Sequence, residues 1–277
     1  MDIAACIERF TNPPPVVAVV RLTGFISAAG SGLTRHGLNI AGVAGPLKAA
    51  FEAKRLAAVA LVVNSPGGSP VQSALIAKRI RAHAAEKKVP VLAFVEDLAA
   101  SGGYWLAAAA DEIIVDDCSI LGSIGVVTSG FGLHEAIGRL GIQRRLYTQG
   151  EHKRMLDPFL PENPEDVARL KALQAEMHDS FKAYVRGRRG DKLKGSDAEL
   201  FNGDVWTGRK AVELGLADAI GDARSVLRSR FGDKVCLRVV GARRSWLRRI
   251  LGRAEGDLPA GLLAAVEDRL MWGRFGL

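Results

Sequence analysis

Three short stretches of the sequence could supply the parts of a nucleophilic site. The first is Ser101, which two glycines follow at the expected start of a short helix. A helix start carries the positive end of the helix dipole, and the Gly102 amide would lie beside the serine hydroxyl. Serine is also a preferred N-cap residue, so this stretch alone favours a structural role. A catalytic role for Ser101 therefore depends on what the other stretches provide.

The second stretch is the turn NSPGGSP at residues 64–70, between an expected strand and an expected helix. Because glycine adopts backbone angles that other residues avoid, a Pro-Gly-Gly turn can point its amides outward and let a ligand approach closely. Outward amides are the donors that stabilise an oxyanion in acyl transfer. A tight strand-to-helix turn needs the same residues, so this motif alone also favours a structural role.

The third stretch, GEHKRM, places Lys153 in an expected loop between His152 and Arg154. A lysine acts as a general base only where burial or nearby positive charge brings its pKa down towards neutrality. Most loop lysines are solvated and inert, so the structural interpretation is strong here too. Of the five histidines in the chain, only His152 lies near this stretch, and it remains a reserve candidate for the base.

The sequence gives no support to several other chemistries. The three cysteines, Cys6, Cys118 and Cys236, are far apart and have no metal-ligand spacing, which argues against a zinc site or a disulfide framework and fits a reducing compartment. No HExxH, P-loop, GxSxG or dinucleotide-binding fingerprint occurs in the chain. Nucleic acid is not an expected partner, because no recognised binding module or basic surface interleaved with aromatic residues is present.

The elements that must position these stretches alternate along the chain. Short apolar runs rich in β-branched residues predict buried strands, and helical spacing of apolar residues predicts helices between them. The strands cover residues 16–24, 56–64, 89–97 and 111–116. The helices cover about 45–55, 69–88 and the segment after Ser101, and a loop is expected over 24–45. Alternation of this kind predicts an α/β fold with a largely parallel sheet.

Further helices and one strand are expected beyond this sheet. GLHEAIGRLGI predicts a helix and QRRLYTQG, at 143–150, predicts a strand. The strongest helix prediction covers 164–186, with Asn163 as N-cap and Pro164 at the first helical position. Its apolar stripe consists of Val167, Leu170, Leu173, Met177, Phe181 and Tyr184. TGRKAVELGLAD predicts a helix that ends at Gly215.

Length and charge allow one large domain or two small ones, and we expect one α/β domain followed by a basic tail. The net charge is +8, and RRSWLRRILGR at 243–253 holds five arginines and no acid. This tail has two interpretations: a helix on an anionic membrane surface, or a terminal helix that docks on its own oligomer. The first fifteen residues lack a signal-peptide pattern, and no apolar run reaches the ~20 residues of a membrane helix, so a cytoplasmic location is expected.

Five stretches, taken together and in this order, resemble the signal peptide peptidase A (SppA) family of serine proteases. They read VVNSPGGS, ASGGYWLAAAADEIIVD, LGSIGVV, GEHKRMLDPF and VWTGRKAVELGLADAIGD, and they span about residues 15–225. The resemblance implies a Clp protease/crotonase-like spiral of β-β-α units, in the short single-domain form without a membrane anchor. It divides the chain into a leader (1–15), an SppA-like peptidase domain (16–225) and a C-terminal strand with a basic amphipathic helical tail (226–277).

The resemblance also implies a site and an activity. It makes Ser101 the nucleophile and Lys153 the general base of a Ser–Lys dyad, and it gives Ser123 the role of orienting the lysine amine. The amides of Gly68 and Gly102 would form the oxyanion hole. The implied activity is that of a serine endopeptidase, without metal or organic cofactor, acting on short hydrophobic or unfolded peptides. The implied assembly is a homo-oligomeric ring in which serine and lysine can come from adjacent protomers.

Three alternatives remain beside this interpretation. A Clp-type Ser-His-Asp triad would need a histidine shortly after Ser101, but residues 102–133 contain none. A crotonase-like enzyme that binds acyl-CoA would leave the order of Ser101, Ser123 and Lys153 unexplained. A catalytically inactive, membrane-associated scaffold of the same fold is disfavoured because both dyad residues are present.

Overall fold

The structure is a computed structural model that describes residues 13–28, 37–241, 269 and 272–277. The chain divides into two compact units, and the predicted site residues are distributed over both. The first unit comprises Met1–Ile124 and Tyr184–Leu277, and the second comprises Gly125–Ala183. The basic stretch 243–253 lies outside the described residues, so the two interpretations of the tail remain predictions.

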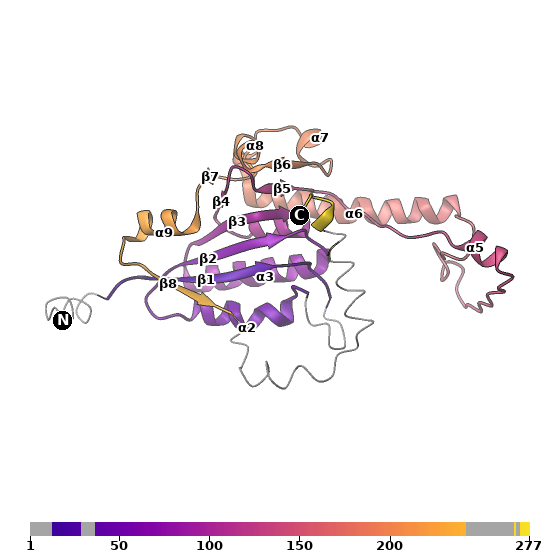
Figure 1. Ribbon diagram of the computed structural model, residues 1–277, viewed down its shortest axis with the longest axis horizontal. Coiled ribbons are helices and arrows are strands. Elements are labelled where there is room, and N and C mark those ends of the chain that lie inside the picture. Colours follow the sequence, from indigo (N-terminus) through magenta and orange to yellow (C-terminus); the bar gives the residue numbers. More distant parts are fainter. Residues whose placement is uncertain (1–12, 29–36, 242–268, 270–271) are drawn as a thin grey trace. The chain divides into compact units, whose positions relative to one another are not determined.

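The first unit is built on an eight-stranded sheet (Figure 1). Its main path runs β6 (Val205–Thr207), β5 (Ile120–Gly122), β3 (Val91–Ala100), β2 (Leu56–Ser65), β1 (Val16–Thr23) and β8 (Cys236–Val240). Off this path, β4 (Glu112–Val115) pairs with β3, and β7 (Ala219–Ile220) pairs with β4. The pairings are parallel except that of β5 with β6. The predicted α/β fold with a largely parallel sheet is confirmed.

The central strands are buried because helices cover a parallel sheet. The helices of this unit are α2 (Ile40–Phe51), α3 (Pro70–Lys87), α4 (Gly102–Ala107), α7 (Asp197–Leu200), α8 (Gly208–Glu213) and α9 (Ala223–Phe231), with a 3-10 turn at Gly190–Lys192. Leu227 of α9 packs into one cluster with Val17, Phe94 and Ile114 of three strands. Each of these four side chains is almost fully removed from water, so the cluster contributes several kcal/mol of hydrophobic free energy, at about 1.5–3 kcal/mol per large side chain.

Helix α2 begins five residues before its predicted start. The Asn39 side chain accepts a hydrogen bond from the Gly42 amide at 2.9 Å and so caps the helix within the stretch that was expected to be loop. Pro46 lies inside this helix although it lacks an amide hydrogen. Leu47 and Phe51 are buried beyond it, and their packing offsets the lost hydrogen bond.

The second unit contains helix α5 (His134–Arg139) and most of α6 (Pro164–Arg189), which crosses into the first unit. The prediction for α6 is confirmed, and the Asn163 side chain accepts a hydrogen bond from the Glu165 amide at 3.0 Å. The strand predicted at 143–150 is wrong. These residues are all exposed and form no strand. No neighbouring strand lies beside them to pair with their amides and carbonyls, and an isolated strand is not stable without such partners.

The end of α8 and the length of the described helices bear on two further predictions. Gly215 follows α8 with φ 74°, and a Cβ there would overlap the Lys192 carbonyl, so the predicted glycine end of this helix is confirmed. Within the part of the chain that the structure describes, no helix is long and apolar enough to cross a membrane.

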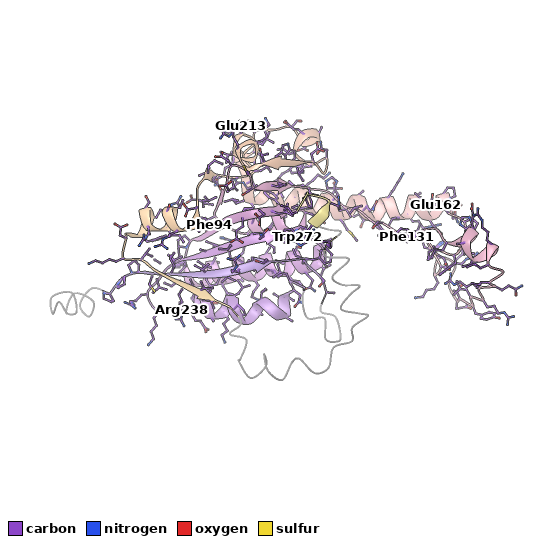
Figure 2. All side chains as sticks on the ribbon, in the orientation of Figure 1. Phe94, Phe131, Glu162, Glu213, Arg238 and Trp272 are labelled. Carbon is purple, nitrogen blue, oxygen red and sulfur yellow. The ribbon has the colours of Figure 1, made fainter. Side chains whose placement is uncertain are left out.

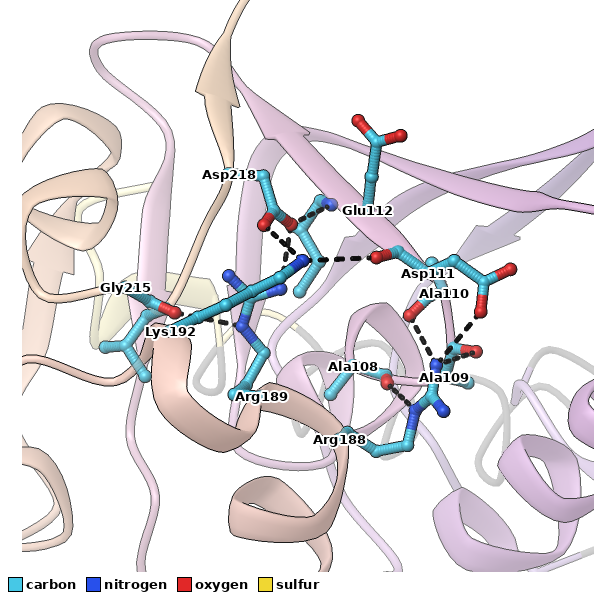
Figure 3. A network of polar contacts seen from close by, with 12 residues as sticks. Ala108, Ala109, Ala110, Asp111, Glu112, Arg188, Arg189, Lys192, Gly215 and Asp218 are labelled. Carbon is cyan, nitrogen blue, oxygen red and sulfur yellow. Dashed lines mark hydrogen bonds and ion pairs between the residues drawn. The ribbon is translucent and has the colours of Figure 1, made fainter.

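Arginine side chains hold the carboxyl end of α4, the helix that follows Ser101 (Figure 3). Arg188 donates from Nε to the Ala108 carbonyl at 2.9 Å and from Nη2 to the Ala110 carbonyl at 2.8 Å. Arg81 donates to the Ala109 carbonyl at 3.2 Å. These carbonyls lie directly after Ala107, the last residue of α4, near the partially negative end of the helix, so guanidinium groups stabilise them. These contacts tie α4 to α3 and to the end of α6.

Arg188→Ala is expected to lower the free energy of unfolding by about 1–3 kcal/mol, because partly buried carbonyls lose their charged donor. Urea unfolding of the full chain measures the change. Arg209→Ala is the matched control: its ion pair with Asp117 is exposed, and such pairs contribute about 0–1 kcal/mol. Equal effects of the two substitutions would show that Arg188 does not stabilise α4.

Candidate active site

Ser101 lies between the last residue of β3 and the first residue of α4, in a strained backbone conformation. Its φ is 51° and its ψ is −119°, a region that costs a residue with a side chain about 1–3 kcal/mol. Its amide donates to the Gly122 carbonyl at 2.8 Å, and its carbonyl accepts from the Trp105 amide at 3.0 Å. These bonds hold the strained serine at the end of the parallel sheet.

The expectation that Ser101 caps α4 through its side chain is wrong. Ser101 occupies the N-cap position, but its hydroxyl makes no capping hydrogen bond. An N-cap side chain bonds back to the helix amides from an extended backbone, whereas the positive φ of Ser101 turns its side chain away from that geometry. The hydroxyl has no hydrogen-bond partner among the described residues, so it is available to a reacting group.

The Pro-Gly-Gly turn lies against this serine. Gly67 and Gly68 have φ values of 100° and 135°. A Cβ on Gly67 would lie 2.9 Å from the Ser101 Cβ, and a Cβ on Gly102 would lie 3.3 Å from the Gly68 nitrogen. Among the described residues, neither the Gly68 nor the Gly102 amide has a hydrogen-bond acceptor. Two amides without acceptors therefore lie close to one unbonded hydroxyl.

The sequence analysis missed the residue that fixes this turn. Ile26 donates from its amide to the Gly67 carbonyl at 2.7 Å and accepts from the Ser69 amide at 2.7 Å. Ser65, fully buried, donates to the Gly24 carbonyl at 2.7 Å and accepts from the Gly67 amide at 3.2 Å. Ile26 stands in a glycine-rich stretch with no strand periodicity, so no pattern in the sequence connects it with residues 64–70.

If the Gly68 amide is an oxyanion-hole donor, as the resemblance to serine proteases implies, Gly68→Ala should reduce acyl transfer at least about a hundredfold. The reason is steric: a Cβ at φ 135° would overlap the Ile26 carbonyl and displace the turn. Steady-state kinetics with a cleavable peptide measure the loss. The matched control is Gly45→Ala, a helical glycine with open space around it, which should leave activity unchanged. Full activity of Gly68→Ala would contradict this role.

Ser123 directly follows β5, the strand that pairs with the end of β3. The pairing of β3 with β5 aligns Ala100 with Gly122, so Ser101 and Ser123 follow two strands that end side by side. Ser123 has φ 50° and donates from its amide to the Asp204 carbonyl at 2.6 Å. The structure therefore brings four of the five predicted site residues to one end of the sheet.

Lys153, the fifth predicted residue, belongs to the second unit. It lies in a run of turns at 151–156, where its amide donates to the Gly150 carbonyl at 3.2 Å. Its side chain is exposed, and its amine has no ion pair or hydrogen bond among the described residues. His152, the reserve candidate for the base, is exposed as well.

Two aromatic side chains of α4 anchor this helix to later segments of the chain. The Tyr104 hydroxyl donates to the Leu216 carbonyl at 2.9 Å, and burial raises its pKa, so it remains a neutral donor at physiological pH. Trp105 stacks on Tyr184 with ring centroids 5.0 Å apart. Together with the arginines that contact residues 108–110, these contacts fix the position of α4, which directly follows Ser101.

A strained serine and two free amides lie at the carboxyl ends of parallel strands, on a Clp protease/crotonase-like α/β fold. A hydroxyl beside free amides is the combination of groups that acyl transfer uses. The sequence profile of Peptidase family S49 matches residues 83–232, more than half of the chain. The chain belongs to Peptidase family S49, and the predicted resemblance to SppA-like proteases is confirmed.

Three comparisons show what this chain is similar to. It is 31% identical to the chloroplastic serine protease SPPA of Arabidopsis thaliana, over 74% of this chain and 30% of that protein. It is 48% identical to the Na(+)/H(+) antiporter NhaA of Brucella abortus, over 98% of this chain and 38% of that protein. A mutant of the 1510-N membrane-bound stomatin-specific protease shares its fold, with a TM-score of 0.52 at 16% identity over 83% of this chain and 99% of that one. The chain thus spans less than half the length of both sequence relatives.

Proposed function

We propose that this chain is a serine endopeptidase that hydrolyses short hydrophobic or unfolded peptides with a Ser–Lys dyad. The observation that carries the proposal is the conformation of Ser101, which keeps an unbonded hydroxyl beside the free amides of Gly68 and Gly102. Membership of Peptidase family S49 supports peptide hydrolysis rather than acyl-CoA chemistry.

The proposed mechanism uses only side chains and amides of the protein, and water. Ser101 attacks the carbonyl carbon of the peptide while its proton passes to the neutral amine of Lys153. The amides of Gly68 and Gly102 stabilise the oxyanion that forms. Collapse of this intermediate expels the amine product, which takes the proton from Lys153. Water then loses a proton to Lys153 and attacks the acyl-enzyme carbonyl. When the bond to Ser101 Oγ breaks, Lys153 returns this proton to Ser101 Oγ, the acid product leaves, and both residues are restored.

The base requires a second copy of the chain in this proposal. A lysine accepts a proton only in its neutral form, which burial favours, whereas Lys153 is exposed in a single chain. Residues 125–183 are all described, and Phe181 is the one buried residue among them. Among the described residues, more than half of the exposed large apolar side chains belong to this unit. A neighbouring protomer in a homo-oligomeric ring would cover that surface and remove Lys153 from water.

Mixing of two inactive variants tests the shared site. Ser101→Ala and Lys153→Ala chains are refolded together and assayed with a fluorogenic hydrophobic peptide. We expect the mixture to regain activity that neither variant has alone, because some sites combine an intact serine with an intact lysine from the neighbour. A mixture as inactive as its components would show that each site is complete within one protomer.

The reaction class is tested with two kinds of ligand. We expect the wild-type chain to cleave hydrophobic decapeptides into fragments that mass spectrometry identifies, and to bind no acyl-CoA in calorimetry. Tight binding of acyl-CoA without peptide cleavage would favour the crotonase-like alternative. A chain that neither binds acyl-CoA nor cleaves peptides would favour the inactive scaffold.

Similarity to a transporter supports a location beside a membrane. In the Brucella antiporters, a segment that matches 98% of this chain belongs to a membrane-transport protein. We propose that this chain is cytoplasmic and contacts the inner membrane face through the five arginines of 243–253. The full chain should co-sediment with anionic liposomes, whereas a chain truncated before Arg243 should stay in the supernatant. Equal sedimentation of both would contradict the contact.

A further inference from the structure

Ser65 is a buried serine at the end of β2 that takes no part in the proposed mechanism. β2 lies between β1 and β3 in the sheet (Figure 2, where Phe94 of β3 is labelled), and Ser65 is fully removed from solvent. A Cβ on Gly103 would lie 2.4 Å from the Ser65 carbonyl oxygen, so α4 packs directly against this strand end. A hydroxyl buried in this way needs hydrogen-bond partners within the protein.

The Ser65 hydroxyl joins two segments of the chain. It donates to the Gly24 carbonyl at 2.7 Å and accepts from the Gly67 amide at 3.2 Å. Gly24 lies two residues before Ile26, and Gly67 lies directly before Gly68. One hydroxyl therefore ties the two segments together just before they pair with each other.

The two segments pair in an isolated parallel bridge between Ile26 and Gly68. Its bonds run from the Ile26 amide to the Gly67 carbonyl and from the Ser69 amide to the Ile26 carbonyl, each at 2.7 Å. Because the C=O and N–H of one trans peptide point in opposite directions, the Gly67 carbonyl that faces Ile26 turns the Gly68 amide away from it. That amide lies on the side of Gly102, where a Cβ would be 3.3 Å from the Gly68 nitrogen.

The glycines of this turn allow a second conformation. Gly67 and Gly68 have φ values of 100° and 135°, and glycine adopts positive and negative φ about equally readily. A rotation that reversed the peptide between them would break the bridge and remove the Gly68 amide from the site. Ser65 opposes this rotation, because it holds the amide of Gly67 and also the carbonyl of Gly24 on the other side of the bridge.

We propose that Ser65 is a positioning residue of the peptidase, whose hydroxyl keeps the Gly68 amide directed at the reacting carbonyl. The inference rests on the proposed function, because it takes that amide as an oxyanion donor. Ser65 is fully buried, so it acts through the turn and not on the substrate. Negative charge on the carbonyl oxygen develops only as the transition state forms, and Ser65 therefore favours the transition state over the bound peptide.

Steady-state kinetics with a fluorogenic hydrophobic peptide test this role. Ser65→Ala should lower kcat about tenfold and leave KM within about twofold, because the donor is in place for a smaller fraction of the time. Ser65→Thr keeps the hydroxyl and should recover kcat to within about threefold of wild type. Ser65→Cys, whose thiol is a weak donor and acceptor, gives the same comparison where Ser65→Ala does not fold.

Ser119→Ala is the matched control. Ser119 is also buried, and its hydroxyl accepts from the Asp116 amide at 3.0 Å and donates to the Glu96 carbonyl at 2.6 Å. The substitution therefore removes the same kinds of hydrogen bond as Ser65→Ala, but none of them involves the Pro-Gly-Gly turn. It should lower stability by a similar amount and keep kcat within about twofold of wild type.

A peptide aldehyde provides a readout that depends on the oxyanion itself. Ser101 Oγ adds to the aldehyde carbon, the hydroxyl proton passes to Lys153, and the former carbonyl oxygen becomes an oxyanion that the Gly68 amide binds. Its inhibition constant should rise about tenfold in Ser65→Ala, in proportion to the fall in kcat/KM. Binding of the uncleaved peptide to Ser101→Ala, followed by anisotropy, should change less than about twofold when Ser65→Ala is added.

Hydrogen exchange of the full-length chain, followed by mass spectrometry, reports on the turn without any activity. Residues 64–70 should exchange faster in Ser65→Ala than in wild type, and at the wild-type rate in Ser119→Ala. Equal kcat values for Ser65→Ala and Ser119→Ala would overturn the proposal. A folded Ser65→Thr variant that recovers no activity would overturn it too.

Failure of this inference and failure of the proposed function are distinguishable. If the wild type cleaves no peptide but exchange over 64–70 rises in Ser65→Ala alone, Ser65 holds the turn and the peptidase proposal fails. If the wild type cleaves peptides but Ser65→Ala has the kcat of Ser119→Ala, the peptidase stands and the positioning role fails.

Discussion

Ser101→Ala is expected to lower kcat/KM for a hydrophobic peptide by about a thousandfold or more, because the variant lacks the group that attacks the carbonyl. The substitution removes a hydroxyl that has no hydrogen bond among the described residues, so the fold should not change. Circular dichroism and thermal unfolding should match the wild type, while product formation falls to background. Retention of activity by folded Ser101→Ala would exclude Ser101 as the nucleophile.

Ser101→Gly separates the strain from the chemistry. Glycine adopts the φ of 51° and ψ of −119° without steric cost, so this variant should be as inactive as Ser101→Ala but more stable. The expected gain is about 1 kcal/mol in the free energy of unfolding, measured by urea titration. A Ser101→Gly variant less stable than Ser101→Ala would show that the backbone at this position is not strained.

Lys153→Ala is expected to lower kcat/KM by a similar factor, about a thousandfold, because the serine loses its proton acceptor. Lys153→Arg makes the test sharper. Arginine keeps the positive charge and much of the length, but its guanidinium cannot release a proton, so this variant should be as inactive as Lys153→Ala.

His152→Ala is the matched control for the lysine variants, since His152 is an exposed neighbour on the same turn. It should keep activity within about threefold of wild type, as expected for the loss of an exposed side chain. An inactive His152→Ala beside an active Lys153→Ala would transfer the role of base to the histidine.

The sheet and most of its helices could be predicted because burial leaves a periodic pattern in the sequence. The runs at 56–63 and 89–95 are apolar throughout, as is typical of strands in a covered parallel sheet. The start of α2 was missed because it depends on one capping side chain, that of Asn39, in a stretch rich in glycine. The strand at 143–150 was wrong because a strand requires a neighbour, which a local pattern does not reveal.

The candidate site was predictable in its residue types but not in its geometry. Small residues around Ser101 pointed to a helix start, and serine at a helix start normally caps the helix. The observed positive φ depends on contacts between residues distant in sequence. The Gly122 carbonyl accepts a hydrogen bond from the Ser101 amide, and Ile26 binds the Pro-Gly-Gly turn that lies beside Ser101. Such contacts arise only when the strands assemble, so no local pattern records them.

Reaction of the full-length chain with a fluorophosphonate probe tests most directly whether Ser101 is the nucleophile. The treated protein is digested, and mass spectrometry locates the modified residue. We predict one phosphonylated site in the wild type, at Ser101, and no modification in Ser101→Ala. Modification at Ser123 or another serine, or a proteolytically active preparation that the probe leaves unmodified, would contradict the assignment.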